Sequence, residues 1–474
     1  MKTIQGISSL AAITIAWALP ITAQAGQTSS AESAGGSAIS EWWNGKSATG
    51  NWFGVRDTLE DHGVKLGIEW KANFLWNTDG GLQQRFGYDD EWKFRGTFDA
   101  AKLTNWEALE GLSFYTDLRY RGGSGVNKYI GTGNTGQFAP STFQGGRLWR
   151  FQNAYFTYVT PSLFGVKDFL TLSGGWQNPT DIFLNQPLNK FFLNNTFTSN
   201  RGIGANGFGW GGSFASWGGY AKVKPNDVFY AQSGLYLAVP GYGSTSNHGL
   251  YFAGAQPPDS NGLYWLNEVG FTPKLGAAKL AGRYAAGFLY WGVENRSFFN
   301  AKYDQRVMFY WQADQQLFRE PSPEAPVLSK GPSDGKTAVD GKDFKGAVDA
   351  PKAKLNEQGL YFFSLINFAP KYNNVQPFYF HTGLVYKGLI PTRDNDQFGI
   401  GLAYGNYSYY KILDDYNDGR SVHQTYEGVL EFDYRIQINK WSYVQPNLQY
   451  IIRPGGTGLT QNATVLGFQV GVTF

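Results

Sequence analysis

The strongest constraint on the fold is a strict two-residue repeat over the final stretch of the sequence, Ala463 to Phe474. Apolar side chains occupy alternate positions, at Leu466, Phe468, Val470, Val472 and Phe474. Small or polar residues lie between them, at Gly467, Gln469, Gly471 and Thr473. Successive side chains of a β-strand point to opposite faces, so this segment predicts a strand with one apolar and one polar face. A strand of about ten residues with this pattern is typical of a transmembrane barrel.

The beginning of the sequence has the pattern of a secretory signal. Lys2 supplies a positive charge, Ile7 to Leu19 is an apolar core, and Ala23 to Ala25 fits an A-x-A cleavage site. The apolar core is shorter than the ~18 residues of a membrane-spanning helix, which weighs against the alternative of an N-terminal membrane anchor. We therefore expect residues 1–25 to be a removed signal peptide.

The composition supports a barrel over a helical membrane protein or an ordinary soluble protein. Mean hydropathy is −0.35, and no later apolar run approaches the ~18 residues of a membrane-spanning helix. Aromatic residues make up 17% of the chain and charged residues 16%, against about 25% charged residues in typical soluble domains. The absence of cysteine excludes disulfides and thiolate metal sites. The net charge of +3 gives no support for a nucleic-acid partner.

Alternating segments separated by turn residues recur along the chain. The predicted strands before the final one are Val64 to Trp76, Trp92 to Ala100, Leu112 to Tyr120, Leu148 to Tyr158, Phe169 to Gln177, Trp210 to Lys224, Val228 to Leu237, Leu263 to Phe271, Ala278 to Tyr290, Arg306 to Phe318, Gly359 to Phe368, Gln376 to Lys387, Gln397 to Tyr404, Tyr426 to Ile436 and Tyr443 to Ile452. They predict an all-β fold, a transmembrane antiparallel β-barrel of about sixteen strands.

The connections between these segments alternate in length. Short turns are expected at the periplasmic end, and long Gly- and Asn-rich loops such as Asn178 to Gly209 at the external end. By this count the segment Glu320 to Gln358, rich in Pro, Lys, Asp and Gly, is a long periplasmic insertion, unless the count is wrong by one strand nearby.

The segment ahead of the first strand contains a short predicted helix. Trp52 to His62 is compatible with a helix that ends at Gly63 and plugs or braces the periplasmic mouth. Gly26 to Ser40 has the composition of an unstructured linker. The predicted organisation is a signal peptide (1–25), a linker with a short helix (26–63) and the barrel (64–474).

The inward faces of several predicted strands carry charged residues. The early strands present Lys93, Arg95, Asp117, Arg119 and Arg121, and a late strand presents Glu427, Glu431, Asp433 and Arg435. One interpretation is that these residues merely keep an aqueous lumen polar. The other is that opposed charges across a narrow waist order water and offer hydrogen bonds to hydroxylated solutes. Both interpretations stay open at this point.

Motifs for enzymatic or metal chemistry do not hold up. Two G-x-G-x-x-G matches begin at Gly131 and Gly202, but neither opens a strand-to-helix unit with an acidic residue behind it. The four histidines are too widely spaced for a metal site, and no G-x-S-x-G sequence occurs. The acidic run Asp414 to Gly419 reads as a solvated loop, because Tyr416 interrupts the calcium-binding pattern. We expect no cofactor and no catalytic site.

The chain resembles the OprB-type carbohydrate-selective porins over nearly all of the expected mature sequence. The blocks that carry the resemblance are Gly50 to Arg56 with Leu59 and Gly63, Tyr220 to Gly241, Asn247 to Leu250, Gly262 to Leu263, Glu268 to Gly270, Asp314 to Gln315, Gln358 to Leu360, Gly383 to Arg393 with Asp396, and Gln445 to Tyr450. The order and spacing of these blocks together indicate the family more specifically than any single block does. Two features depart from the family pattern, the long insertion and the absence of a basic residue from Gly174 to Gln177.

The resemblance implies a water-filled channel for small sugars in the bacterial outer membrane, narrowed by external loops that fold inward. The implied partners are small sugars, outer-membrane lipid and, because Phe474 resembles the terminal signal of outer-membrane proteins, the barrel-assembly machinery. A homotrimer and a monomer both stay open. Two alternatives in function also stay open: a general, unselective porin, and a barrel enzyme such as a lipid hydrolase.

Overall fold

The computed structural model describes residues 34–132, 137–143, 148–200, 202–208, 215–238, 262–321 and 358–474. The chain forms two compact units, one up to Trp43 and one from Asn44 onward. In the first unit, Ala34–Trp43 is a helix, α1. The expectation of an unstructured linker from Gly26 to Ser40 is therefore wrong for its last residues, from Ala34 onward, which are helical.

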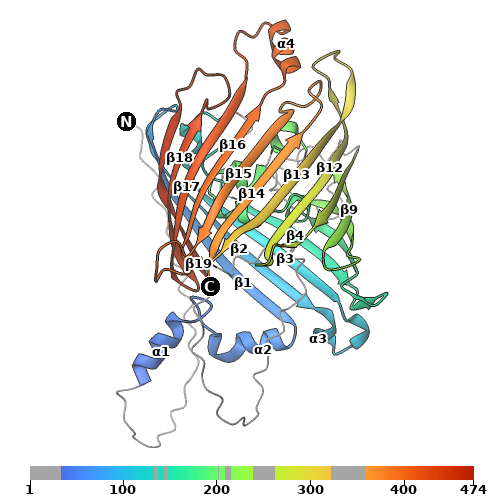
Figure 1. Cartoon of the computed structure of the whole chain (residues 1–474), viewed down its shortest axis with the longest axis vertical. Helices are drawn as coiled ribbons and strands as arrows, with labels where there is room; N and C mark the ends of the chain where they lie inside the picture. The colour runs from blue at the N-terminus through green and yellow to red at the C-terminus, as the bar shows by residue number, and fades with distance from the viewer. Residues whose placement is uncertain are drawn as a thin grey trace, which may run out of the picture. The chain divides into compact units, whose positions relative to one another are not determined.

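The second unit is a closed antiparallel barrel of sixteen strands, which confirms the predicted fold class (Figure 1). Its strands are β1 (Val64–Asp79), β2 (Phe86–Asp99), β3 (Leu112–Ser124), β4 (Leu148–Val159), β7 (Leu170–Gln177), β8 (Ser216–Val223), β9 (Phe229–Ala238), β10 (Gly262–Phe271), β12 (Leu280–Arg296), β13 (Tyr303–Arg319), β14 (Gly359–Phe368), β15 (Phe378–Lys387), β16 (Gln397–Asn406), β17 (Tyr426–Asn439), β18 (Ser442–Ile452) and β19 (Ala463–Thr473). Three two-residue strands lie in turns: β5 (Ser162–Leu163), β6 (Val166–Lys167) and β11 (Lys274–Leu275).

The barrel closes where β19 pairs with β1, and the outward side chains of β19 are those predicted by the terminal alternation. Phe74 lies opposite Phe468, and their outward rings stack with centroids 5.0 Å apart. Outside β19, the ring of Phe474 stacks on Trp92 of β2 at 5.6 Å. The outer wall is therefore apolar and aromatic at the seam, as a lipid-facing surface requires.

The loops follow the predicted asymmetry. Short turns such as that between β17 and β18 lie at the end of the barrel that also carries α3 (Ala100–Thr104), and α4 (Tyr409–Asn417) lies at the opposite end (Figure 1). Strands β13 and β14 are neighbours, and Glu320 N donates to Gln358 O (3.0 Å) where the insertion leaves and rejoins the barrel. The strand count was therefore not wrong there. Residues 322–357 of the insertion, and Trp210 at the expected start of β8, lie outside the described residues.

The predicted short helix is present ahead of β1, as η1 (Trp52–Gly54) and α2 (Val55–Asp61). Arg56 donates from its guanidinium to the backbone oxygen of Phe474 (3.1 Å) and lies over the Trp52 ring (4.4 Å). Gly63 ends the segment with φ +89°, and a Cβ there would lie 2.8 Å from Lys102 Cβ. Only glycine satisfies both conditions. The helix thus braces the end of β19, as expected at the periplasmic mouth.

The remaining helical elements are single turns or short segments. They are η2 (Glu107–Leu109), η3 (Val126–Tyr129), η4 (Pro179–Asp181), η5 (Leu188–Phe191), η6 (Thr196–Asn200) and η7 (Gly204–Asn206). Among the helices of the described residues, none combines the length and the apolar character needed to cross a membrane.

Two connections, β3–β4 and β7–β8, fold into the interior of the barrel. The β7–β8 connection is described over residues 178–200 and 202–208, and we call it the inner loop. Its Phe183, Phe192 and Phe197 belong to a buried apolar cluster together with inward residues of the wall such as Phe363 of β14. The hydrophobic core of this barrel therefore lies between the inner loop and the wall, not between two sheets.

Candidate functional site: a constricted lumen

The inner loop sits on a glycine seat in the barrel wall. Gly399 and Gly401 of β16 face inward, opposite Val385 and Gly383 of β15. A Cβ at Gly399 would lie 2.4 Å from the Phe191 ring, and one at Gly401 would lie 2.8 Å from the Phe197 ring. Because the wall has no side chains at these two positions, the phenylalanines of the loop can lie directly on its backbone.

Glu431 of β17 is the first polar anchor of the inner loop. Its carboxylate accepts hydrogen bonds from the backbone N–H groups of Leu193 (2.7 Å) and Asn194 (3.2 Å), and from Asn447 Nδ2 (2.8 Å). The side chain is fully buried. A buried carboxylate is stable only when it is well hydrogen-bonded, so the loop backbone and Glu431 require each other.

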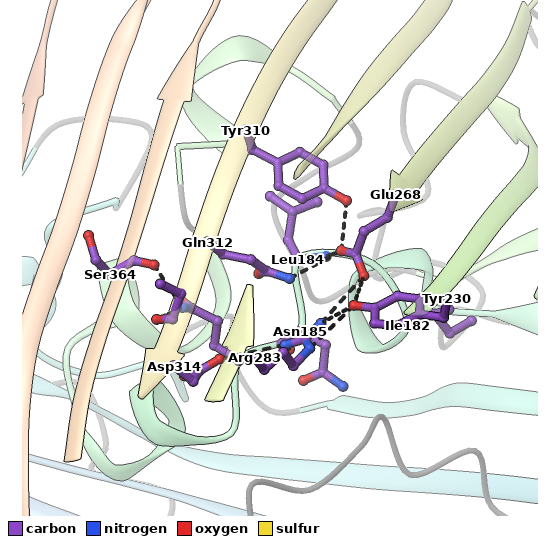
Figure 2. Close-up of polar contacts among 12 residues, drawn as sticks. Ile182, Leu184, Asn185, Tyr230, Glu268, Arg283, Tyr310, Gln312, Asp314 and Ser364 are labelled. Carbon is purple, nitrogen blue, oxygen red and sulfur yellow. Dashed lines mark hydrogen bonds and ion pairs between the residues drawn. The ribbon is translucent and has the colours of Figure 1, made fainter. Parts of the chain in front are cut away.

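A second polar anchor holds the loop to β10 and β12 (Figure 2). Glu268 of β10 accepts hydrogen bonds from Leu184 N (3.3 Å), Tyr310 Oη (2.8 Å) and Tyr230 Oη (2.7 Å). Arg283 of β12 donates to the backbone oxygen of Asn185, and its guanidinium lies 3.4 Å from Glu268 Oε1. These contacts come from neighbouring strands, so this anchor also ties the wall together.

A third contact lies between the two anchors. Gln186 Nε2 donates to the backbone oxygens of Ala313 (3.1 Å) and Ser364 (2.9 Å). Its Oε1 is 2.9 Å from His381 Nε2, in the inward face of β15. The inner loop is therefore fixed to the wall from β10 to β17 over most of its length.

The β3–β4 connection meets the inner loop inside the barrel. Asn195 N donates to Ala139 O (2.9 Å), and Asn194 Nδ2 donates to Phe138 O (3.2 Å). On its other side the connection is held by Ser141, whose hydroxyl donates to Asp89 Oδ1 of β2 (2.9 Å). The two loops together thus bridge the interior from β2 to β17, which narrows the lumen.

Opposite the anchored part of the inner loop, β1 to β4 present a wall of charged side chains. We call it the charged wall, and its members are Glu69, Lys71, Glu91, Lys93, Arg95, Asp117, Arg119, Arg121 and Arg150. Glu69 pairs with Lys71 (2.9 Å) and with Arg95. Glu91 pairs with Lys93 (3.2 Å) and with Arg121 (2.6 Å), and Asp117 pairs with Arg119 (2.6 Å).

The early half of the predicted site comes together in this wall. Lys93 and Arg95 of β2, and Asp117, Arg119 and Arg121 of β3, all point inward on adjacent strands. The sequence pattern assigns no role to Glu69 and Lys71, and it does not include Glu91 because the predicted strand begins one residue later, at Trp92, whereas β2 begins at Phe86. The alternation of Glu91, Lys93 and Arg95 was the signal that would have found it.

The late half of the predicted site is arranged differently from the expectation. Glu427 accepts hydrogen bonds from Tyr407 Oη (2.7 Å) and Gly455 N (2.6 Å), Glu431 is covered by the inner loop, and Asp433 accepts from Gln445 and Asn447 (2.9 Å each). Their exposed fractions are 0 to 2%. These carboxylates therefore do not face the charged wall across open space. Arg435 is only half-buried, and its guanidinium lies 4.4 Å from the Tyr443 ring.

The motifs set aside in the sequence lie only partly within the described residues. The described residues contain no group of three or more His, Asp or Glu side chains that could hold a metal ion. Gly133 and Gly136 lie outside the described residues, and Gly202 is followed by the short η7. The expected solvated loop at Asp414 is instead part of α4, where Asp414 pairs with Arg296 (2.8 Å) and Asp415 with Lys411 (2.6 Å).

Comparisons with known proteins place the chain in a family and match its fold. The OprB family of carbohydrate-selective porins matches residues 83–474. Porin B of Pseudomonas aeruginosa is 26% identical over 462 residues, covering 91% of this chain and 92% of Porin B. The high-pH and low-pH structures of Pseudomonas putida OprB match with TM-scores of 0.73 and 0.54, at 22% and 19% identity, each covering 91% of this chain and 99% of the other. The chain belongs to the OprB family of carbohydrate-selective porins.

Proposed function

We propose that small, glucose-like sugars diffuse passively between the inner loop and the charged wall of this outer-membrane channel. The observation that carries the proposal is the fixed position of the inner loop, which is held by the buried Glu431 and Glu268 and by the glycine seat. A loop anchored in this way keeps one lumen width, and a fixed width can select solutes by size.

The chemistry of the charged wall suits hydroxylated solutes. Its carboxylates and guanidinium groups offer closely spaced hydrogen-bond acceptors and donors, such as Asp117 beside Arg119. A sugar can exchange its water contacts for these groups, whereas an apolar solute of equal size loses water contacts without replacement.

The deciding experiment is liposome swelling with purified protein. Glucose should enter faster than amino acids of equal size, and equal rates would favour the unselective porin. Glu431→Leu removes the acceptor for two loop N–H groups, at a cost of roughly 1–3 kcal/mol each. This variant should lose the preference for sugar, whereas Glu431→Gln, which keeps one acceptor oxygen, should lose less of it.

We further infer that residues 1–25 are a cleaved signal peptide and that Phe474 is the residue recognised by the barrel-assembly machinery. The apolar start of the chain and the outward position of Phe474 beside Trp92 support these inferences. Cross-linking in intact cells from a photoreactive residue at position 474 tests the inference about the barrel-assembly machinery.

A monomer and a homotrimer are both compatible with the apolar outer wall, and native mass spectrometry distinguishes them.

A further inference from the structure

The charged wall carries more cations than anions. Its cations are Lys71, Lys93, Arg95, Arg119, Arg121 and Arg150, and its carboxylates are Glu69, Glu91 and Asp117. Six positive and three negative side chains leave an excess of three positive charges. Two further acids lie beside the wall, Asp181 of the inner loop, which accepts from Asn153 of β4 (3.2 Å), and Asp89 of β2, and one further cation, Arg435, faces inward from β17. The positive excess therefore remains when the neighbours of the wall are included.

Within the wall, most of the accessible charged side chains are positive. The side chains of the paired cations are 15 to 44% exposed, with Arg95 the most open. Glu91 and Asp117 are only 2% exposed, because they lie beneath the cations that they pair with. Glu69, at 23% exposed, is the one accessible carboxylate of the wall, so a solute in the lumen meets five accessible cations and one accessible carboxylate.

The opposite side of the lumen does not compensate for this charge. Glu268 and Glu431 have their carboxylates turned into the backbone of the inner loop, and Asp433 is held by two amide side chains. Asp89 lies under Ser141 with 2% exposure. The acids that could have balanced the charged wall are therefore used to anchor the loops, and the open lumen is left with a positive field.

From this asymmetry we infer that the channel passes monosaccharide acids, sugars that carry a carboxylate, faster than neutral sugars of the same size. The inference rests on the proposed function and specifies its substrate class. A cleft lined by one sign of charge concentrates the opposite ion. Guanidinium groups in addition match a carboxylate in planar, two-bond geometry, so Arg95, the most exposed cation of the wall, can bind the acid while other groups take the hydroxyls.

The test is uptake of radiolabelled glucuronate and glucose by proteoliposomes containing the full-length protein, with potassium and valinomycin present to balance charge. At low salt, glucuronate should enter about three- to tenfold faster than glucose. At 1 M salt the advantage should shrink, because the Debye length falls to about 3 Å. The double variant Lys93→Gln/Arg95→Gln should bring the ratio of the two rates towards one.

Lys440→Gln is the matched control, because it removes one positive charge from an exposed turn outside the lumen. This variant should keep the wild-type ratio. The inference is overturned if the wild-type protein takes up glucuronate no faster than glucose. It is also overturned if the ratio of the two rates does not change with salt, or if the double variant has the wild-type ratio. If neither sugar enters, the proposed function fails as well. The salt dependence of the wild-type protein decides the matter even if the double variant does not fold.

Discussion

Arg119 and Arg121 lie on the inward face of β3, each within 2.6 Å of a carboxylate oxygen. Their positions follow from the alternation of the strand, which turns Leu118 and Tyr120 outward. The opposite register would place both arginines against lipid at roughly 2–4 kcal/mol each near the bilayer midplane. At the residue scale, the hydrocarbon around the barrel therefore determines which side chains line the lumen.

The double variant Arg119→Glu/Arg121→Glu tests the role of these two residues. It should leave the barrel folded and shift ion preference towards cations, because it reverses two charges at the charged wall. The measurement is the reversal potential across a planar bilayer under a KCl gradient, with Lys440→Glu as the control outside the lumen. A folded variant with unchanged ion preference would place these arginines away from the narrow part of the pore.

Gly401 has no side chain for a structural reason, since Phe197 occupies the space that its Cβ would fill. Gly401→Val should cost roughly 1–3 kcal/mol of overpacking and displace the inner loop from its seat. We expect higher single-channel conductance and weaker discrimination between sugars. Gly67→Val is the control, because Gly67 also faces inward but has nothing within 4 Å of its Cβ position. Equal conductance of the two variants would contradict the claim that Gly401 positions the inner loop.

At the scale of elements, the end of β19 is held from three directions. The N–H of Phe474 donates to Ile68 O (2.9 Å), its ring stacks on Trp92, and its backbone oxygen accepts from Arg56 of α2 (3.1 Å). The seam between β19 and β1 is thus closed by a strand, a ring and a helix. Each of these contacts contributes little free energy alone, but all three lie at the seam where the barrel closes.

Phe474→Ser should therefore lower the yield of folded barrel much more than Thr473→Ser. The first change removes the aromatic stack, worth about 0.5–1.5 kcal/mol, and an outward aromatic at the interface girdle. The second changes an inward side chain and leaves the backbone hydrogen bonds of β19 in place. The yield of heat-sensitive, fast-migrating band on a gel is the readout, and similar yields would contradict this interpretation of the seam.

At the scale of the whole molecule, every long strand of the barrel has two hydrogen-bonded neighbours, and β1 closes on β19. No strand edge is left for detergent to open. We predict that the purified protein migrates faster on a gel before boiling than after it, and that its mature form begins at Gly26. Identical migration of the two samples, or mass spectrometry of an intact Met1, would count against the closed barrel or the cleavage site respectively.

The strands, their inward and outward faces and the seam follow from the sequence pattern. Each of these depends on contacts that repeat every two residues against the same lipid or the same water, so a local pattern such as Leu112 to Tyr120 is sufficient. It also placed Lys93, Arg95 and Arg119 in one charged surface, because neighbouring strands in a barrel are neighbours in sequence.

Which inward residues stay open to the lumen depends instead on how the loops pack inside the barrel. Glu431 occupies an inward position of its strand, as Arg119 does. It nevertheless lies under Leu193, a residue 238 positions away in the chain. Contacts over such distances leave no periodic signal, because they depend on how one irregular loop fits one glycine seat. The strand pattern identified the inward face, and loop packing then separated the anchoring carboxylates from the cations that remain accessible.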